Sequence, residues 1–129
     1  NKVEFIFTEQ DNQGVKIKGK FIDGFKAELK LEQVNKTIVI DLSAFQDLYI
    51  ENKIYDRKGE LQEEVEPWID PFSLLEPVDM DGDGVYELRG FQAVAGFFHA
   101  NKISELVSFW KYEKKWRILT VKYSTTLAF

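Results

Sequence analysis

The sequence contains no cysteine, one histidine and three prolines in 129 residues. Without cysteine there can be no disulfide, no thiol nucleophile and no thiolate metal site. Because His99 is the only histidine, a metal site built from several imidazoles is also excluded. The neighbours of His99 place it near a strand end or turn, and we interpret it as a surface or edge histidine rather than a general base.

Long apolar runs and blocks of basic residues are also missing. No stretch of about 18 apolar residues is present, so we expect no membrane insertion by this segment. The formal net charge is −5, with a pI near 5.0, which disfavours nucleic acid as a partner. The densest basic cluster is interrupted by Tyr112, Glu113 and Trp116, and we predict that it forms a solvated hairpin tip; its members are Lys111, Lys114, Lys115 and Arg117.

Aromatic residues are plentiful, at 15% of the chain, and hydrophobic residues make up 44%. This composition argues against disorder, and aromatic enrichment with few prolines favours sheet over helix. We therefore predict a single domain over residues 1–129 that is mainly β, or α+β with one short helix. Antiparallel hairpins or meanders would form one or two packed sheets.

The first half of the chain predicts strands at 3–7, 15–21, 25–31 and 37–42. Residues 25–31 alternate strictly between apolar and charged side chains, and Asp23-Gly24 predicts a two-residue hairpin turn before them. Residues 43–49 predict either a short helix capped by Ser43 or the start of a strand. The large side chains of Trp68, Trp110 and Trp116 are expected mostly in the core, with Trp116 as the exception near a hairpin tip.

All three prolines fall between residues 60 and 78. We interpret 60–78 as an irregular connection between an N-terminal β half and a C-terminal meander. That meander is predicted as a strand at 86–98 followed by a hairpin of 103–112 and 115–125. In the last strand, Leu119, Val121 and Tyr123 are predicted to share one face.

A glycine-hinged acidic loop stands at residues 79–87 and predicts a Ca²⁺ site. Carboxylates at relative positions one, three and five can point to one centre, while a glycine at position six turns the backbone and oxygens at positions seven and nine complete the ligand set. The residues at these positions are Asp79, Asp81, Asp83, Gly84, Val85 and Glu87. Oxygen ligands of this kind suit Ca²⁺ better than Mg²⁺ or Zn²⁺. The alternative is an acidic surface turn without a bound ion.

The loop is not an EF-hand, because position twelve is Gly90 instead of glutamate and the flanking residues favour extended chain. Its Asp-x-Asp-Gly-Asp-Gly core resembles the calcium loop of the FG-GAP/VCBS repeats of secreted bacterial proteins. The resemblance implies side-chain ligands from the acidic residues of the loop and a carbonyl ligand from Val85; the acidic residues are Asp79, Asp81, Asp83 and Glu87. We find one copy, whereas a propeller needs roughly four or more blades.

The acidic loop predicts a secreted or cell-surface domain with a structural calcium ion and no catalysis. The resemblance implies a bacterial protein that binds a protein or carbohydrate partner or acts as an accessory module. The chain begins at Asn1 and shows no signal peptide, which fits an exported protein whose export segment has been removed. One alternative is an inhibitor or partner-binding domain that presents the acidic loop at 60–66 or an aromatic sheet face. Another is a small hydrolase with calcium near a concave active site.

Overall fold

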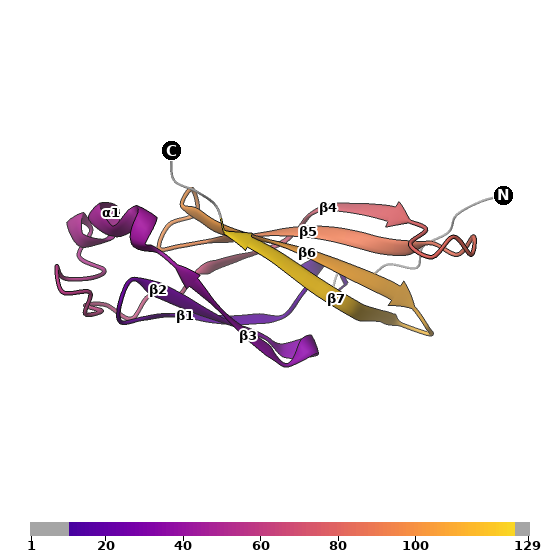
Figure 1. The fold of residues 1–129 in the computed structure, drawn as a ribbon, viewed down its shortest axis with the longest axis horizontal. Coiled ribbons are helices and arrows are strands. Elements are labelled where there is room, and N and C mark those ends of the chain that lie inside the picture. Colours follow the sequence, from indigo (N-terminus) through magenta and orange to yellow (C-terminus); the bar gives the residue numbers. More distant parts are fainter. Residues whose placement is uncertain (1–10, 126–129) are drawn as a thin grey trace.

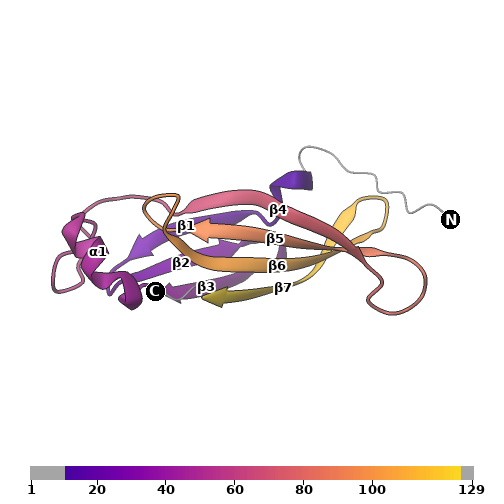
Figure 2. The ribbon, with the colours of Figure 1, turned by 90° about the horizontal axis from the view of Figure 1, so that it is seen from above.

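A computed structural model describes residues 11–125; the strand predicted at 3–7 lies outside this range. The described chain forms two antiparallel sheets that lie face to face (Figures 1 and 2), so the mainly β prediction is confirmed. The three-stranded sheet holds β1 (Ile17–Ile22), β2 (Lys26–Leu31) and β3 (Lys36–Asp41), and the four-stranded sheet holds β4 (Trp68–Val78), β5 (Glu87–Ala95), β6 (Lys102–Tyr112) and β7 (Trp116–Thr125). No helix within residues 11–125 has the length and apolar character to cross a membrane.

The helical segments are short. They are the 3-10 turns η1 (Asp11–Gln13), η2 (Glu32–Val34) and η3 (Ser43–Phe45) and the helix α1 (Gln46–Glu51). Of the two alternatives for residues 43–49, a short helix or the start of a strand, the structure therefore has the helix. The predicted cap by Ser43 is wrong, because the N-cap residues are Leu42 for η3 and Phe45 for α1 and neither makes a side-chain cap hydrogen bond. An Asp41 carboxylate oxygen accepts the Ser43 backbone N–H at 2.9 Å just before these turns.

The first sheet follows the alternation in its sequence. Ala27, Leu29 and Leu31 are buried, whereas Lys26 and Lys30 are exposed and Glu28 is half-buried. The hairpin turn has three residues instead of the predicted two, because the register pairs Ile22 with Lys26. Phe25 adopts a left-handed backbone with φ 59°, and its ring packs 4.8 Å from that of Tyr55. Burial of this ring offsets the strain of the left-handed turn.

The prediction of an irregular connection is wrong for residues 68–78, because they form strand β4. Among residues 11–125, β4 pairs only with β5 and so lies at the edge of the four-stranded sheet. Pro71 and Pro77 are tolerated there because an edge strand leaves half of its N–H groups outside the ladder. The register also shifts on both sides of Phe72, next to Pro71. Residues 60–67 remain a loop, which is mostly exposed although Leu61 and Val65 pack against the core.

The prediction that Leu119 and Val121 share one face of the last strand is also wrong. Phe109 pairs with Thr120 and Trp110 pairs with Ile118, so Leu119 is an extra residue in a β-bulge. A bulge breaks the two-residue alternation. Ile118 and Val121 consequently both pack against the core, while the Leu119 side chain is 49% exposed. Leu119 therefore does not share a face with Val121.

One hydrophobic cluster joins the two sheets, with Val94, Ile103 and Leu106 packed against the buried residues of β1–β3. At the α1 end, the buried hydroxyl of Tyr49 donates a hydrogen bond to the Asn101 side chain. Gly96 is required beside this pair, because a Cβ there would overlap both polar groups. Burial raises the pKa of the Tyr49 hydroxyl.

A buried polar residue, Gln92, ties the two sheets together near their other end. Its Oε1 accepts the Val15 backbone N–H at 3.0 Å, and its amide donates to the Val15 carbonyl at 3.2 Å. The side chain is 1% exposed. Because every one of these bonds is made in the interior, Gln92 fixes the position of the segment that precedes β1 against β5.

Candidate metal centre

The acidic loop joins β4 to β5 at the end of the molecule opposite α1 (Figure 1). Its backbone turns sharply because Gly82 and Gly84 adopt left-handed conformations with φ of 72° and 82°. The turn directs backbone N–H groups at Asp79: one carboxylate oxygen accepts from Asp83 at 3.1 Å and the other accepts from Gly84 at 2.9 Å. The loop thus holds the first predicted ligand in place by its own backbone.

Three of the predicted ligands converge. One carboxylate oxygen from each of Asp79, Asp81 and Glu87 lies within 4.8 Å of the others. Two oxygens bound to the same Ca²⁺ at about 2.3–2.6 Å can lie at most about 5.2 Å apart, so the observed spacing fits a shared calcium ion. Three carboxylates at this distance repel one another unless a cation compensates for their charge.

Glu87 gives an independent indication of a bound cation. It is the first residue of β5 and its side chain is only 2% exposed. Its Oε1 accepts the Met80 backbone N–H at 3.2 Å, whereas its Oε2 is buried and has no hydrogen-bond partner among residues 11–125. An unpartnered buried carboxylate oxygen is costly, and coordination of a metal ion would satisfy it.

The Asp83 carboxylate is not part of the converging group. An Asp83 carboxylate oxygen accepts the Val85 backbone N–H at 2.8 Å. This bond is the main reason that the pKa of Asp83 is lowered, and the positive charge of Lys111 lowers it further. The Val85 side chain is 58% exposed. The ligand roles of these two residues therefore stay predictions.

His99 lies in the turn between β5 and β6 and is exposed, as expected for a surface histidine. Its Nε2 lies 2.9 Å from an Asp70 carboxylate oxygen, and its ring packs against that of Trp68. The Trp68 side chain is 51% exposed, so the most exposed tryptophan is Trp68, whereas Trp116 was the predicted exception. Trp116 is half-buried beside Tyr112.

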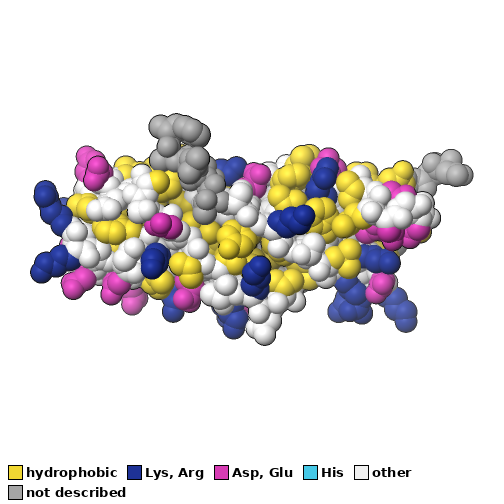
Figure 3. Space-filling view, in the orientation of Figure 1, with side chains coloured by type: hydrophobic (Ala, Val, Ile, Leu, Met, Phe, Trp, Pro, Cys, Tyr) yellow, Lys and Arg dark blue, Asp and Glu magenta, His cyan; other side chains and the backbone are white. Residues whose placement is uncertain are grey.

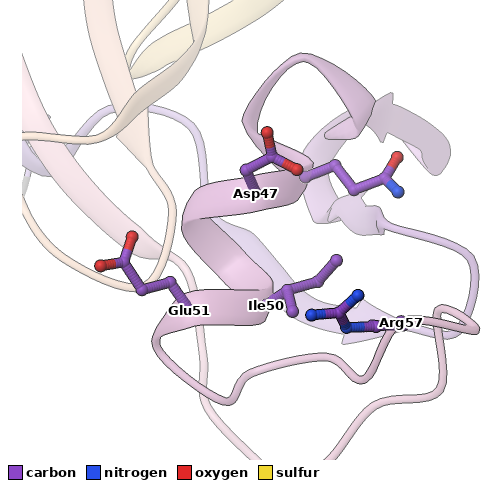
Figure 4. A pocket seen from close by; sticks show the side chains of 5 residues that line it. Asp47, Ile50, Glu51 and Arg57 are labelled. Carbon is purple, nitrogen blue, oxygen red and sulfur yellow. The ribbon is translucent and has the colours of Figure 1, made fainter.

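A hollow of about 470 Å³ lies beside α1, and its lining includes Asp47, Ile50, Glu51 and Arg57 (Figure 4). Asp47 and Glu51 point in different directions there, and Arg57 lies beside Ile50. These carboxylates do not face a common point. The hollow therefore lacks the convergence of acidic groups that the acidic loop shows.

Residues 15–124 match the family model of the YybI C-terminal domain. The chain is 37% identical over 92 residues to the uncharacterized protein YybI of Bacillus subtilis (strain 168), and the match covers 71% of this chain and 35% of that protein. The chain thus spans about a third of the length of this curated relative. No solved structure matches it.

Proposed function

This chain belongs to the YybI C-terminal domain family, and we propose that it is a non-catalytic binding or accessory domain stabilised by one structural Ca²⁺. Asp79, Asp81 and Glu87 would supply carboxylate oxygens, with Asp83 and the Val85 carbonyl completing the shell. The observation that carries this proposal is the buried, unpartnered Oε2 of Glu87 beside two further carboxylates.

The structural role follows from where the ligands sit. Asp79 follows the end of β4 and Glu87 begins β5, so one ion would link both strands of the hairpin. The carboxylates that hold the ion would be occupied by that task, so none of them would be free to act as an acid or base. Calcium would bind the folded loop more tightly than the unfolded chain, and folding would become calcium-dependent.

We further propose that the domain works outside the cell or on its surface. Exposed calcium modules bind with Kd values of about 10⁻⁴ to 10⁻³ M, which suits extracellular calcium. The partner would be a protein or a carbohydrate.

A second candidate is a partner-binding domain that presents a sheet face to another protein. On the outer side of the four-stranded sheet, the side chain of Leu74 is 53% exposed. The register places Phe91 and Val107 beside it across two strands. Such a row of apolar side chains on a half-exposed face is typical of contact surfaces.

Thermal unfolding in excess EDTA and in about 10 mM Ca²⁺ tests the calcium site. We expect calcium to raise the unfolding temperature of the wild type by several degrees and to have much less effect on Asp81→Asn, which keeps the side-chain shape but removes one charged ligand. Glu64→Gln is the matched control, because Glu64 is exposed and lies in the loop at 60–66. The proposal fails if calcium leaves the wild type unchanged or shifts all three proteins equally.

A further inference from the structure

A groove of about 890 Å³ lies between the two sheets at the end that carries the acidic loop. One wall comes from the segments that flank the three-stranded sheet and includes Lys16 and Gln33. The other wall comes from the β6–β7 hairpin and includes Trp110, Lys115, Trp116 and Arg117. Its size is in the range of small-molecule sites.

The groove is basic although the chain as a whole is acidic. Lys16, Lys115 and Arg117 line it, and Asp11 is its one acidic residue among those described. Within residues 11–125, Lys16 and Lys115 form no ion pair, and Arg117 has only a 3.8 Å contact with the exposed Glu113. Figure 3 shows basic side chains gathered over the tip of the β6–β7 hairpin, below the acidic loop. Such a charge distribution favours an anion.

The walls also offer aromatic surface in a fixed position. Trp110 is held by a hydrogen bond from its indole N–H to the Ser108 hydroxyl at 2.7 Å, and Trp116 packs 5.3 Å from Tyr112. On the opposite wall, Gln33 accepts the Lys16 backbone N–H at 2.7 Å. The apolar C–H face of a sugar ring packs well on an indole, and a held side chain loses little entropy when it does so.

We propose that this groove binds a short anionic saccharide. The indoles of Trp110 and Trp116 would contact sugar rings, while Lys16, Lys115 and Arg117 would bind their carboxylate groups. An acidic peptide could use the cations but has no rigid C–H face for the two indoles. This ligand class rests on the proposed function only in taking the domain to be a binding domain. It does not depend on the calcium site, because no groove residue is a proposed metal ligand.

The probe for this proposal is trigalacturonate, titrated by isothermal calorimetry and tryptophan fluorescence in low salt and excess EDTA. Maltotriose is the uncharged comparison and triglutamate is the acidic peptide comparison. We expect trigalacturonate to bind at least about tenfold more tightly than either one, because only it uses both the cations and the indoles. Added salt should weaken that binding.

Two groove variants, Lys16→Gln and Lys115→Gln, should each weaken trigalacturonate binding by about threefold to tenfold. Lys58→Gln is the matched control, because Lys58 is exposed and lies outside the groove. Trp116→Phe should also weaken the binding, and adding Lys16→Gln to that variant should weaken it further. The proposal is overturned if trigalacturonate does not bind, if maltotriose or triglutamate binds as well, or if the groove variants behave like Lys58→Gln.

The same titration with Asp81→Asn separates the two proposals. This variant should keep its affinity for trigalacturonate in EDTA even though its unfolding temperature no longer responds to calcium. Failure of the calcium test therefore leaves the groove result intact, and failure of the groove test leaves the calcium result intact.

Discussion

Replacement of Glu87 with glutamine tests the metal centre, because we expect it to stabilise the protein in EDTA and to weaken its response to calcium. Glu87 is 2% exposed and its Oε2 has no hydrogen-bond partner among the described residues. An unsatisfied buried polar group costs about 1–3 kcal/mol, and a charged one costs more. Without calcium, Glu87→Gln removes this buried charge and its repulsion with two neighbouring carboxylates. We therefore expect the variant to be more stable than the wild type in EDTA, by about 1–3 kcal/mol.

With calcium the advantage of the variant should shrink. For a Kd of about 10⁻⁴ to 10⁻³ M, about 10 mM Ca²⁺ stabilises the folded wild type by about 1.4 to 2.7 kcal/mol. For a domain of this size that corresponds to a rise in unfolding temperature of roughly 4 to 11 °C. Glutamine keeps one neutral oxygen but loses the charge, so the calcium-induced rise should be much smaller in the variant.

The assay is thermal unfolding followed by circular dichroism, for wild type, Glu87→Gln and the control Glu64→Gln, each with EDTA and with calcium. Glu64→Gln removes the same charge from an exposed site and should respond to calcium as the wild type does. If Glu87→Gln is less stable than the wild type in EDTA, the cost of the buried carboxylate has been misjudged. If its response to calcium equals that of the wild type, Glu87 is not a ligand.

Two further predictions concern the rest of the fold. The Ser43 backbone N–H donates to Asp41 and lowers the pKa of that carboxyl below its ordinary value of 3.8. The ionised carboxyl therefore stabilises the fold above pH 3.8, and this stabilisation is lost as the pH falls through the folded pKa. The difference in unfolding free energy between wild type and Asp41→Asn, measured by urea unfolding, should shrink as the pH is lowered from 5 to 3, and a constant difference would contradict this. Tyr49→Phe leaves the buried Asn101 oxygen without its donor and should lower the unfolding free energy by about 1–3 kcal/mol in urea, whereas an unchanged value would mean that this hydrogen bond has no net effect.

Local patterns in the sequence were sufficient to predict most of the first sheet and the acidic loop. The alternation from Phe25 to Leu31 reports directly which side chains face the core, and carboxylates spaced two residues apart can converge without help from the rest of the fold. The same reasoning failed for β4, because proline disfavours a central strand but is tolerated at a sheet edge. Whether a strand lies at an edge depends on the order of strands, which is a property of the whole fold.

Other features depended on tertiary packing. The bulge at Leu119 moves one side chain to the surface without any glycine or proline to signal it. The burial of Glu87 follows from its place at the start of β5, and its charge alone would have predicted exposure. The groove was missed because Lys16 and Lys115 come from opposite ends of the chain, and only the packing of the two sheets brings them to one site.

The acidic loop and the groove are connected by one residue of β5. Leu88 follows Glu87 directly and pairs with Trp110. Leu88, Trp110 and Trp116 line a small apolar hollow next to the groove. An ion that holds Glu87 would therefore also restrain the strand that supports both indoles. Because such coupling is reciprocal, a ligand that binds to the indoles would in turn strengthen calcium binding. The coupling should be modest, since β5 is already held between β4 and β6 by its backbone ladder and by Gln92.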